Sequence, residues 1–262
     1  MTESVLEKIA AATRTRIAAA KARTSEDALR ERIARAAATH SLLARLRRPG
    51  LHVISEIKLA SPSAGSLGEG LDPAAVAADY AANGAAAISV LTEPQFFRGE
   101  LAHLEAVRRT VELPVLMKDF LLDQYQILQA RAAGADAVLL IAALLGERLP
   151  QLLAVTEGFG LDALVEVHDE DEMRAALDAG ARLVGVNNRN LKTLAVDLET
   201  SRRLARYADR AVLVCESGLR ERRELDEMLT LGYRGFLIGT QLIRGGRPGA
   251  ALAKLLGRGA AP

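Results

Sequence analysis

Residues 131–141 read RAAGADAVLLI, and this stretch shows how the whole chain is organised. An amphipathic segment ends at Ala133, Gly134 follows it, and an apolar run begins three residues later at Ala137. Glycine readily adopts the left-handed conformation that ends many helices. A short, unbroken apolar run is typical of a strand buried on both faces, as in a parallel sheet. The stretch therefore predicts a helix, a glycine cap and a parallel strand in direct succession.

The same order of features recurs along the chain. Glycines in the equivalent position lie 50, 46 and 52 residues apart, at Gly84, Gly134, Gly180 and Gly232. Eight short apolar runs occur, at residues 51–57, 86–90, 115–117, 137–141, 163–167, 183–186, 211–215 and 235–238. Between Lys58 and Ile238 these runs follow one another about every 26 residues, which is the spacing of an eight-stranded βα barrel.

A doubly wound open sheet is the alternative α/β fold for such a pattern. That fold normally has fewer strands and a Gly-x-Gly-x-x-Gly fingerprint after the first one. No such fingerprint follows residues 51–57. We therefore expect an α/β protein of the (βα)8 TIM-barrel class, with residues 1–262 forming a single barrel domain.

Residues 1–48 differ from the rest, because they are rich in Ala, Arg and Glu and contain no Gly. Residues 25–27 (SED) have the composition of a helix start. We expect a helical N-terminal extension, which either packs on the barrel as an arm or covers a site as a lid. Side chains that recur there at helical spacing are Leu6, Ile9, Thr13 and Ile17.

The composition excludes several classes of protein. Half of the 262 residues are hydrophobic, which is enough to bury a full core. The net charge of +1 excludes a basic field over the whole protein for nucleic acid, and 3% aromatic residues without Trp argue against base stacking. Cys215 is the single cysteine, so no internal disulfide can form. Since no apolar leader or membrane-length apolar run occurs either, we expect a soluble cytoplasmic protein.

Charged side chains stand where the predicted strands end. The carboxyl ends of barrel strands meet at one mouth, which carries the active site. Glu56 and Lys58 share a face of the first strand because they are two residues apart. Burying so many charges is unfavourable unless each is paired, so we interpret them as a functional cluster. A structural ion pair that seals the barrel is the alternative. The cluster comprises Glu56, Lys58, Lys118, Glu166 and Glu216.

Other strand ends suggest how a ligand is held. Small residues and hydroxyls follow strands seven and eight, where barrels often bind phosphate, and the loop 61–65 offers further donors. Three of the five phenylalanines follow strands two and three and suggest a flat apolar ligand. His168 is interpreted as a rim residue, Cys215 is expected to face the helices, and no His or Cys spacing suggests a metal. The phosphate candidates are Ser61, Ser217, Gly218, Gly239 and Thr240, and the phenylalanines are Phe96, Phe97 and Phe120.

Taken together and in this order, the strand ends resemble those of the indole-3-glycerol phosphate synthase family of tryptophan biosynthesis. The resemblance runs along the whole chain, including the N-terminal extension. The segments that carry it are 56–63 (EIKLASPS), 89–93 (SVLTE), 117–120 (MKDF), 164–168 (LVEVH), 185–191 (GVNNRNL), 216–218 (ESG) and 237–240 (LIGT).

This resemblance implies a lyase that uses neither a cofactor nor a metal. Its substrate would be a phosphorylated anthranilate derivative, 1-(2-carboxyphenylamino)-1-deoxyribulose 5-phosphate, whose pyrrole ring closes with loss of CO2 and water. By resemblance, Lys118 is the general acid that protonates the carbonyl oxygen, and Glu166 transfers protons during dehydration. Glu56 belongs to the same catalytic cluster, and the division of acid and base work between Glu56 and Glu166 stays open. We expect burial among other cations to lower the pKa of Lys118.

The remaining roles also come from the resemblance. Lys58 would meet the anionic groups of the substrate, and Leu59 stands where many relatives carry a basic residue, so we expect weaker phosphate binding. Asn187, Glu216 and Ser217 would bind the sugar chain and hold the cluster in place. The phosphate grip would be Ser61, Gly218, Gly239 and Thr240, the anthranilate pocket Leu91, Phe97, Phe120 and Leu139, and further substrate contacts Arg189 and Ile238.

Two rival functions can be compared with these residues. A phosphoribosylanthranilate isomerase-like barrel would use a cysteine and an aspartate on opposite walls, and the first strand ends without a cysteine. A non-catalytic phosphate-binding barrel would have lost part of the charged cluster, which is complete here. We therefore expect an enzyme with a small-molecule ligand and no nucleic-acid or membrane partner. The sequence carries no signal for or against complexes with other tryptophan-pathway enzymes.

Overall fold

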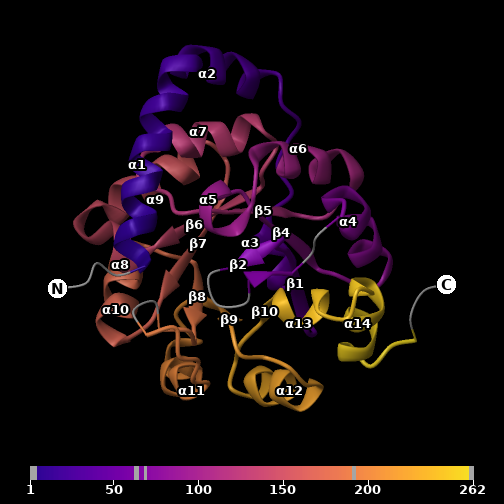
Figure 1. The fold of residues 1–262 in the computed structure, drawn as a ribbon. Coiled ribbons are helices and arrows are strands. Elements are labelled where there is room, and N and C mark those ends of the chain that lie inside the picture. Colours follow the sequence, from indigo (N-terminus) through magenta and orange to yellow (C-terminus); the bar gives the residue numbers. More distant parts are fainter. Residues whose placement is uncertain (1–4, 62–64, 68–69, 191–192, 260–262) are drawn as a thin grey trace.

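The computed structural model describes residues 5–61, 65–67, 70–190 and 193–259. Part of the predicted donor loop, residues 62–64, lies outside these ranges. Eight parallel strands form a closed barrel surrounded by helices, which confirms the predicted fold (Figure 1). Around the barrel the strands are β1 (His52–Ile57), β10 (Gly235–Ile238), β9 (Val212–Glu216), β8 (Leu183–Asn187), β7 (Asp162–Val167), β6 (Ala137–Ile141), β5 (Val115–Lys118) and β4 (Ala87–Leu91).

The outer helices follow the strands in the predicted alternation. The four repeat glycines all have a positive φ between 90° and 100°, as a left-handed helix end requires. The longer helices are α4 (Pro73–Ala82), α6 (Leu101–Thr110), α7 (Gln124–Ala132), α9 (Leu149–Gly158), α10 (Glu170–Asp178), α11 (Glu199–Leu204), α12 (Arg222–Thr230) and α14 (Pro248–Leu255). Shorter elements are β2 (Ala60–Ser61), β3 (Gly65–Ser66), α5 (Pro94–Phe97), α8 (Ala142–Leu145), η1 (Gly146–Arg148), η2 (Ala205–Tyr207) and α13 (Thr240–Ile243).

Three strands extend one residue beyond the apolar runs that predicted them. Lys118, Asn187 and Glu216 are the last residues of β5, β8 and β9. A run of apolar side chains ends where the polar residue begins, but the ladder of backbone hydrogen bonds continues because it does not depend on side-chain polarity. These polar side chains are therefore fixed by strand pairing rather than carried on mobile loops.

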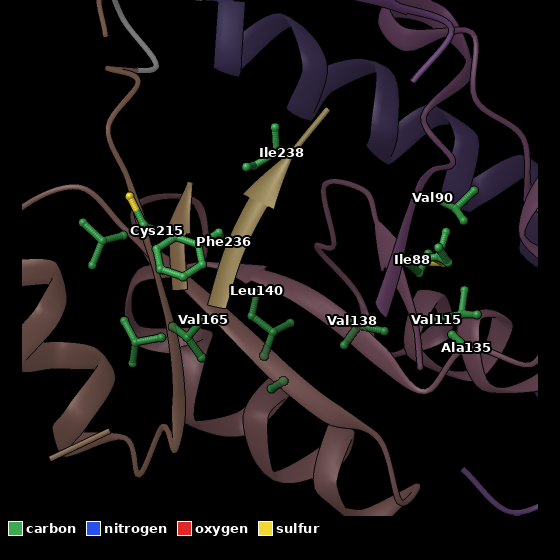
Figure 2. Close-up of a cluster of buried hydrophobic side chains, with 14 of the residues drawn as sticks. Ile88, Val90, Val115, Ala135, Val138, Leu140, Val165, Cys215, Phe236 and Ile238 are labelled. Atoms are coloured by element: carbon green, nitrogen blue, oxygen red, sulfur yellow. The ribbon is translucent and has the colours of Figure 1, made fainter. Parts of the chain in front are cut away.

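Two apolar layers hold the barrel together. The outer layer lies between strands and helices and includes Val138, Leu140, Cys215 and Phe236 (Figure 2). Cys215 therefore faces the helices, as its alternation with Glu216 predicts. The inner layer fills the barrel with Ile54, Leu116, Leu139, Leu164, Leu183, Val214 and Leu237, together with Leu42, Leu43 and Leu46 of α3 (Leu42–Leu46).

Helix α3 closes the end of the barrel opposite the strand carboxyl termini. Leu43 N donates to Asp162 at the start of β7, and Leu46 lies against Gly235 at the start of β10. Ser41 caps the helix by accepting from Ala44 N. The helix therefore keeps water out of the barrel from below, while the carboxyl ends of the strands remain open to ligands.

The N-terminal extension, residues 1–48, contains α1 (Val5–Arg23), α2 (Glu26–Ala34) and α3, and α1 and α2 also pack on the barrel. Ile9, Thr13 and Ile17 are buried, and Ser25 caps α2 at the predicted start. Arg16 forms a two-pronged ion pair with Asp119 at the end of β5. The extension is thus a packing arm, and its first turns also reach the barrel mouth. Among the described residues, no helix has both the length and the apolarity needed to cross a bilayer.

The barrel plug supports a prediction about stability. Leu46→Ala removes a fully buried side chain and should lower the free energy of unfolding by about 2–5 kcal/mol. Leu231→Ala is the matched control, because Leu231 is 37% exposed and its loss should cost less than about 0.5 kcal/mol. Urea unfolding of both variants measures the difference. Equal losses would show that α3 does not plug the barrel in solution.

Candidate active site

A cavity of about 330 Å³ opens at the carboxyl ends of the strands. Apart from Phe96, the structure brings the catalytic and ligand-binding residues expected from the sequence to the wall of this one cavity. The charged and polar residues are Glu56, Lys58, Ser61, Lys118, Glu166, Asn187, Arg189, Glu216, Ser217 and Thr240, and the apolar ones and glycines are Leu91, Phe97, Phe120, Leu139, Gly218, Ile238 and Gly239. Phe96 does not line the cavity.

The five charged residues of the cluster lie next to one another in the cavity. Lys118 Nζ lies 3.1 Å from Glu216 Oε2 and 3.4 Å from Glu166 Oε2. Lys58 Nζ lies 2.7 Å from Glu56 Oε1. The three carboxylates are buried, and the two lysines are largely so. Each positive charge is thus held by carboxylates, which is the arrangement that makes buried charge tolerable.

Strand register places these side chains at one level. Glu166 of β7 pairs with Ile141 of β6 on one side and with Gly185 of β8 on the other. Glu216 of β9 pairs with Asn187 of β8. Because alternate side chains of a strand point to opposite faces, the residues that point inward at this level come together in the barrel mouth.

Two glycines make room for the carboxylates. A Cβ atom on Gly185 would collide with Glu216 Oε1, and one on Gly239 would collide with Glu56 Oε1. Gly185 has no positive φ, so its small size rather than its conformational freedom is what the site uses. The glycine in β8 is therefore part of the construction of the acidic cluster.

The loop after β9 is held in an unusual conformation. Ser217 has a φ of 63° and Gly218 a φ of 91°, and left-handed conformation is uncommon for serine. Asn188 Nδ2 fixes this turn by donating to the carbonyl oxygens of Glu216 and Ser217. The turn presents Ser217 and Gly218 to the cavity beside Glu216.

The two carboxylates around Lys118 differ in acidity. Burial raises the pKa of Glu216, and the charge of Glu166 adds to this against the opposing effect of Lys118, so that the pKa of Glu216 lies at about 7. Burial also works to raise the pKa of Glu166, but Lys118, His168 and a hydrogen bond with Asn187 outweigh it and hold the pKa below its ordinary value. Asn187 is oriented for this bond, because its Oδ1 accepts from Arg189 N at 3.0 Å.

The pKa of Lys118 departs from the sequence-based expectation. Burial alone would lower it, but the charges of Glu216, Glu166 and Glu56 together raise the pKa above its ordinary value. The expected lowering by burial among cations was wrong for this reason: the nearest neighbours of Lys118 are carboxylates. The ammonium group is therefore fully protonated at neutral pH.

Sequence reasoning missed several residues of the cavity wall. Leu6 and Ile9 of α1 were not among the expected site residues but line it, so the extension borders the site, as its interpretation as a lid implies, as well as packing on the barrel. Arg220 and Arg244 also line it, beyond the glycine and threonine that follow β9 and β10. Their position a few residues after the expected phosphate loops was the signal that could have identified them. Within the ranges that the structure describes, no group of His, Cys, Asp and Glu is arranged to hold a metal ion.

Comparison with known proteins identifies the family. The family model for indole-3-glycerol phosphate synthase matches residues 6–255. The chain belongs to the indole-3-glycerol phosphate synthase family. A protein of this name from Streptomyces griseus is 48% identical over 99% of this chain and 97% of its own length, and one from Parafrankia is 50% identical over the same shares. One from Carboxydothermus hydrogenoformans is 52% identical over 78% of each chain.

Membership of the indole-3-glycerol phosphate synthase family defines the activity as a decarboxylating, ring-closing lyase reaction of tryptophan biosynthesis. A solved structure of thiamine phosphate pyrophosphorylase from Pyrococcus furiosus superposes with a TM-score of 0.61 over 83% of this chain and 96% of that one. At 17% identity this likeness concerns the barrel fold alone.

The close approach at β8 yields a prediction about activity. Gly185→Ala should displace the Glu216 carboxylate from Lys118 and reduce indole-3-glycerol phosphate synthase turnover by about tenfold or more, with about 1–3 kcal/mol lost from stability. Gly158→Ala is the control, since nothing lies within 4 Å of its added Cβ. Steady-state kinetics and urea unfolding of both variants check this. Unchanged turnover in Gly185→Ala would show that Glu216 tolerates displacement.

The raised pKa of Glu216 predicts how stability depends on pH. Between about pH 4.5 and 7 the folded chain retains a proton on Glu216 that the unfolded chain has released. The contribution of Glu216 to the free energy of unfolding therefore falls as pH rises through this range. The free energy of unfolding of the unaltered protein minus that of Glu216→Gln should fall from about pH 4.5 to about pH 7 and remain constant above pH 7. Urea unfolding at each pH measures this, and a constant difference would contradict the raised pKa.

Proposed function

We propose that this cavity binds 1-(2-carboxyphenylamino)-1-deoxyribulose 5-phosphate and closes its ring with Lys118 as the acid and Glu166 as the base. The observation that supports this most is the contact of Lys118 Nζ with both Glu166 and Glu216 in a buried cavity. An ammonium and a carboxylate 3.4 Å apart can give and take protons at neighbouring atoms of one ligand.

The two ends of the proposed substrate match opposite sides of the barrel mouth. Leu91, Phe120 and Leu139 come from β4, the end of β5 and β6, and the Phe97 and Phe120 rings lie with centroids 6.0 Å apart. This wall suits the flat anthranilate ring. The glycine loops after β9 and β10 lie across the barrel, and they suit the phosphate together with Ser61 and Thr240.

Basic residues around the glycine loops supply charge for the phosphate. Arg220, Arg244 and Lys58 line the cavity, and Arg189 stands at the end of β8. A neutral residue at Leu59 therefore does not leave the anionic end of the ligand without cations. The local positive charge is consistent with a chain whose overall net charge is only +1.

Lys118 can serve as an acid with a raised pKa. When an aromatic carbon attacks the ketone, the carbonyl oxygen develops into an alkoxide, which is far more basic than an ammonium ion. The carboxylates around Lys118 ensure that the proton is present when this happens. Loss of CO2 then returns the electrons of the broken C–C bond to the ring and restores its aromaticity. In the dehydration step, the new hydroxyl group takes up a proton from the solvent-connected cavity and leaves as water. Glu166 is ionised because of its lowered pKa and can accept the proton that the neighbouring carbon loses.

Glu56, Asn187, Glu216 and Ser217 complete the proposed machinery around these two groups. Glu56 is paired with Lys58, whereas Glu166 contacts Lys118 and is hydrogen-bonded with Asn187, which favours Glu166 over Glu56 as the partner of Lys118. Glu216 shares Lys118 with Glu166 and holds its ammonium in place. Ser217 presents its hydroxyl beside the proposed sugar chain from the left-handed turn.

A reaction of the phosphoribosylanthranilate isomerase type has less support. Cys215, the single cysteine, lies in the layer between strands and helices and does not line the cavity. Burial raises the pKa of its thiol to about 11, so the thiol is neutral at physiological pH. As part of the same proposal, the ligand is a small molecule rather than a nucleic acid or a membrane, and the single cysteine is compatible with a cytoplasmic location.

The role of Lys118 can be tested directly by indole fluorescence. Mixing the protein with the carboxyphenylamino-deoxyribulose phosphate should give a rising indole signal, and the absence of Trp keeps the background low. Lys118→Ala should reduce kcat by about 10²–10⁴, whereas Lys254→Ala, an exposed lysine of α14, should not change it. Full activity in Lys118→Ala would remove its role as acid. Binding without turnover in the unaltered protein would support the non-catalytic barrel.

A further inference from the structure

We propose that His168 is a positioning residue, which orients Glu166 and sets its protonation through a chain of three side chains, Glu172, His168 and Glu166. The inference rests on the proposed role of Glu166 as the base. His168 is the first residue after β7 and stands two residues beyond Glu166. From the sequence it was interpreted as a rim residue, but the structure shows its ring turned to the catalytic cluster and 14% exposed.

The two oxygens of Glu166 face two different cations. Glu166 Oε2 lies 3.4 Å from Lys118 Nζ, and Glu166 Oε1 lies 3.5 Å from His168 Nε2. His168 Nε2 is buried and forms no hydrogen bond with the described residues, so Glu166 is the acceptor it faces. A shift of a few tenths of an ångström, such as a ligand could cause, would turn this contact into a hydrogen bond.

The other side of the ring is held firmly. His168 Nδ1 lies 3.1 Å from Glu172 Oε2, and the same oxygen accepts from His168 N at 2.8 Å. Glu172 lies in the first turn of α10, where its own N–H donates to Asp169 at 2.9 Å. One carboxylate thus fixes both the backbone and the ring of His168. A proton held on Nδ1 by Glu172 leaves Nε2 to interact with Glu166.

The charges around His168 favour its protonated form. Burial opposes this, but Glu172 of α10, Glu166 of β7 and Glu216 of β9 together raise the pKa of the imidazole. Lys118 of β5 faces the far oxygen of Glu166 rather than the ring. The imidazolium in turn lowers the pKa of Glu166. His168 therefore helps to keep the base ionised at neutral pH, where dehydration needs it.

The pH dependence of kcat tests this role. His168→Gln should lower kcat about tenfold with little change in KM, and it should move the acidic limb of the profile upward by about one pH unit, because Glu166 loses a positive neighbour. Glu172→Gln should move the limb in the same direction by less. His103→Gln is the matched control, because His103 of α6 has no contact with the cavity. A purely structural role would lower stability and leave the limb in place.

Glu166→Gln in the same series separates the two proposals. If Glu166→Gln retains the acidic limb, Glu166 is not the base and the proposed mechanism fails. If Glu166→Gln abolishes the limb but His168→Gln leaves it unmoved, only the role of His168 fails.

NMR titration gives a readout that does not depend on turnover. The protein has four histidines, so the imidazole signals can be assigned by substitution. The pKa of His168 should lie above its ordinary value and should fall in both Glu166→Gln and Glu172→Gln. Glu172→Gln keeps the imidazole in place and tests the chain even if His168→Gln does not fold. An imidazole pKa that stays the same in Glu166→Gln would overturn the inference.

Discussion

Ionised side chains inside a barrel mouth are stable only when cations and anions alternate, and this requirement organises the site. Lys118 lies between Glu166 and Glu216, and Lys58 lies against Glu56. A lone buried carboxylate or ammonium would lose several kcal/mol of hydration free energy, which neighbours of opposite charge offset. The pairing also makes the acidities interdependent. Glu166 has its pKa lowered while Glu216 has its pKa raised to about 7, although both contact the same lysine.

The cluster needs space next to the strands, and two glycines provide it because they carry no side chain. Gly185 and Gly239 leave space for carboxylates that any Cβ would displace. Below the cluster, the inner apolar layer and α3 fill the barrel, so the charges meet water only from the mouth. The apolar packing below the cluster and the two glycines beside it therefore have the same effect. They hold charged groups at fixed distances in a small volume.

The sequence predicts those features that depend on local pattern. Apolar runs and repeated glycines locate the strands and helix ends to within a residue or so. Because the carboxyl ends of barrel strands meet at one mouth, the sequence also predicts that the site residues lie together there. The direction of the Lys118 pKa could not be predicted, because it depends on distances between β5, β7 and β9, which are far apart in the sequence. The same applies to Leu6 and Ile9. Their helical spacing indicates a buried face, but it leaves open whether this face packs on the barrel or covers the site, and the structure shows that part of it lines the cavity. The contact of His168 with Glu172 could not be predicted either, because Glu172 lies on the following helix.

The end of β5 shows how one strand terminus can serve both the site and the extension. Lys118 points into the cluster, and the next residue, Asp119, forms its ion pair with Arg16 of α1. Asp119 is buried and also accepts from Thr92 Oγ1 and from Phe120 N, so its carboxylate has little freedom. The helix that supplies Leu6 and Ile9 to the cavity wall is therefore fixed to the residue beside the proposed acid. Because Phe120 follows directly, the same anchor also sets the position of the apolar wall. Displacement of α1 would thus disturb the proposed anthranilate pocket and Lys118 together, which explains why an extension outside the eight βα units belongs to the site.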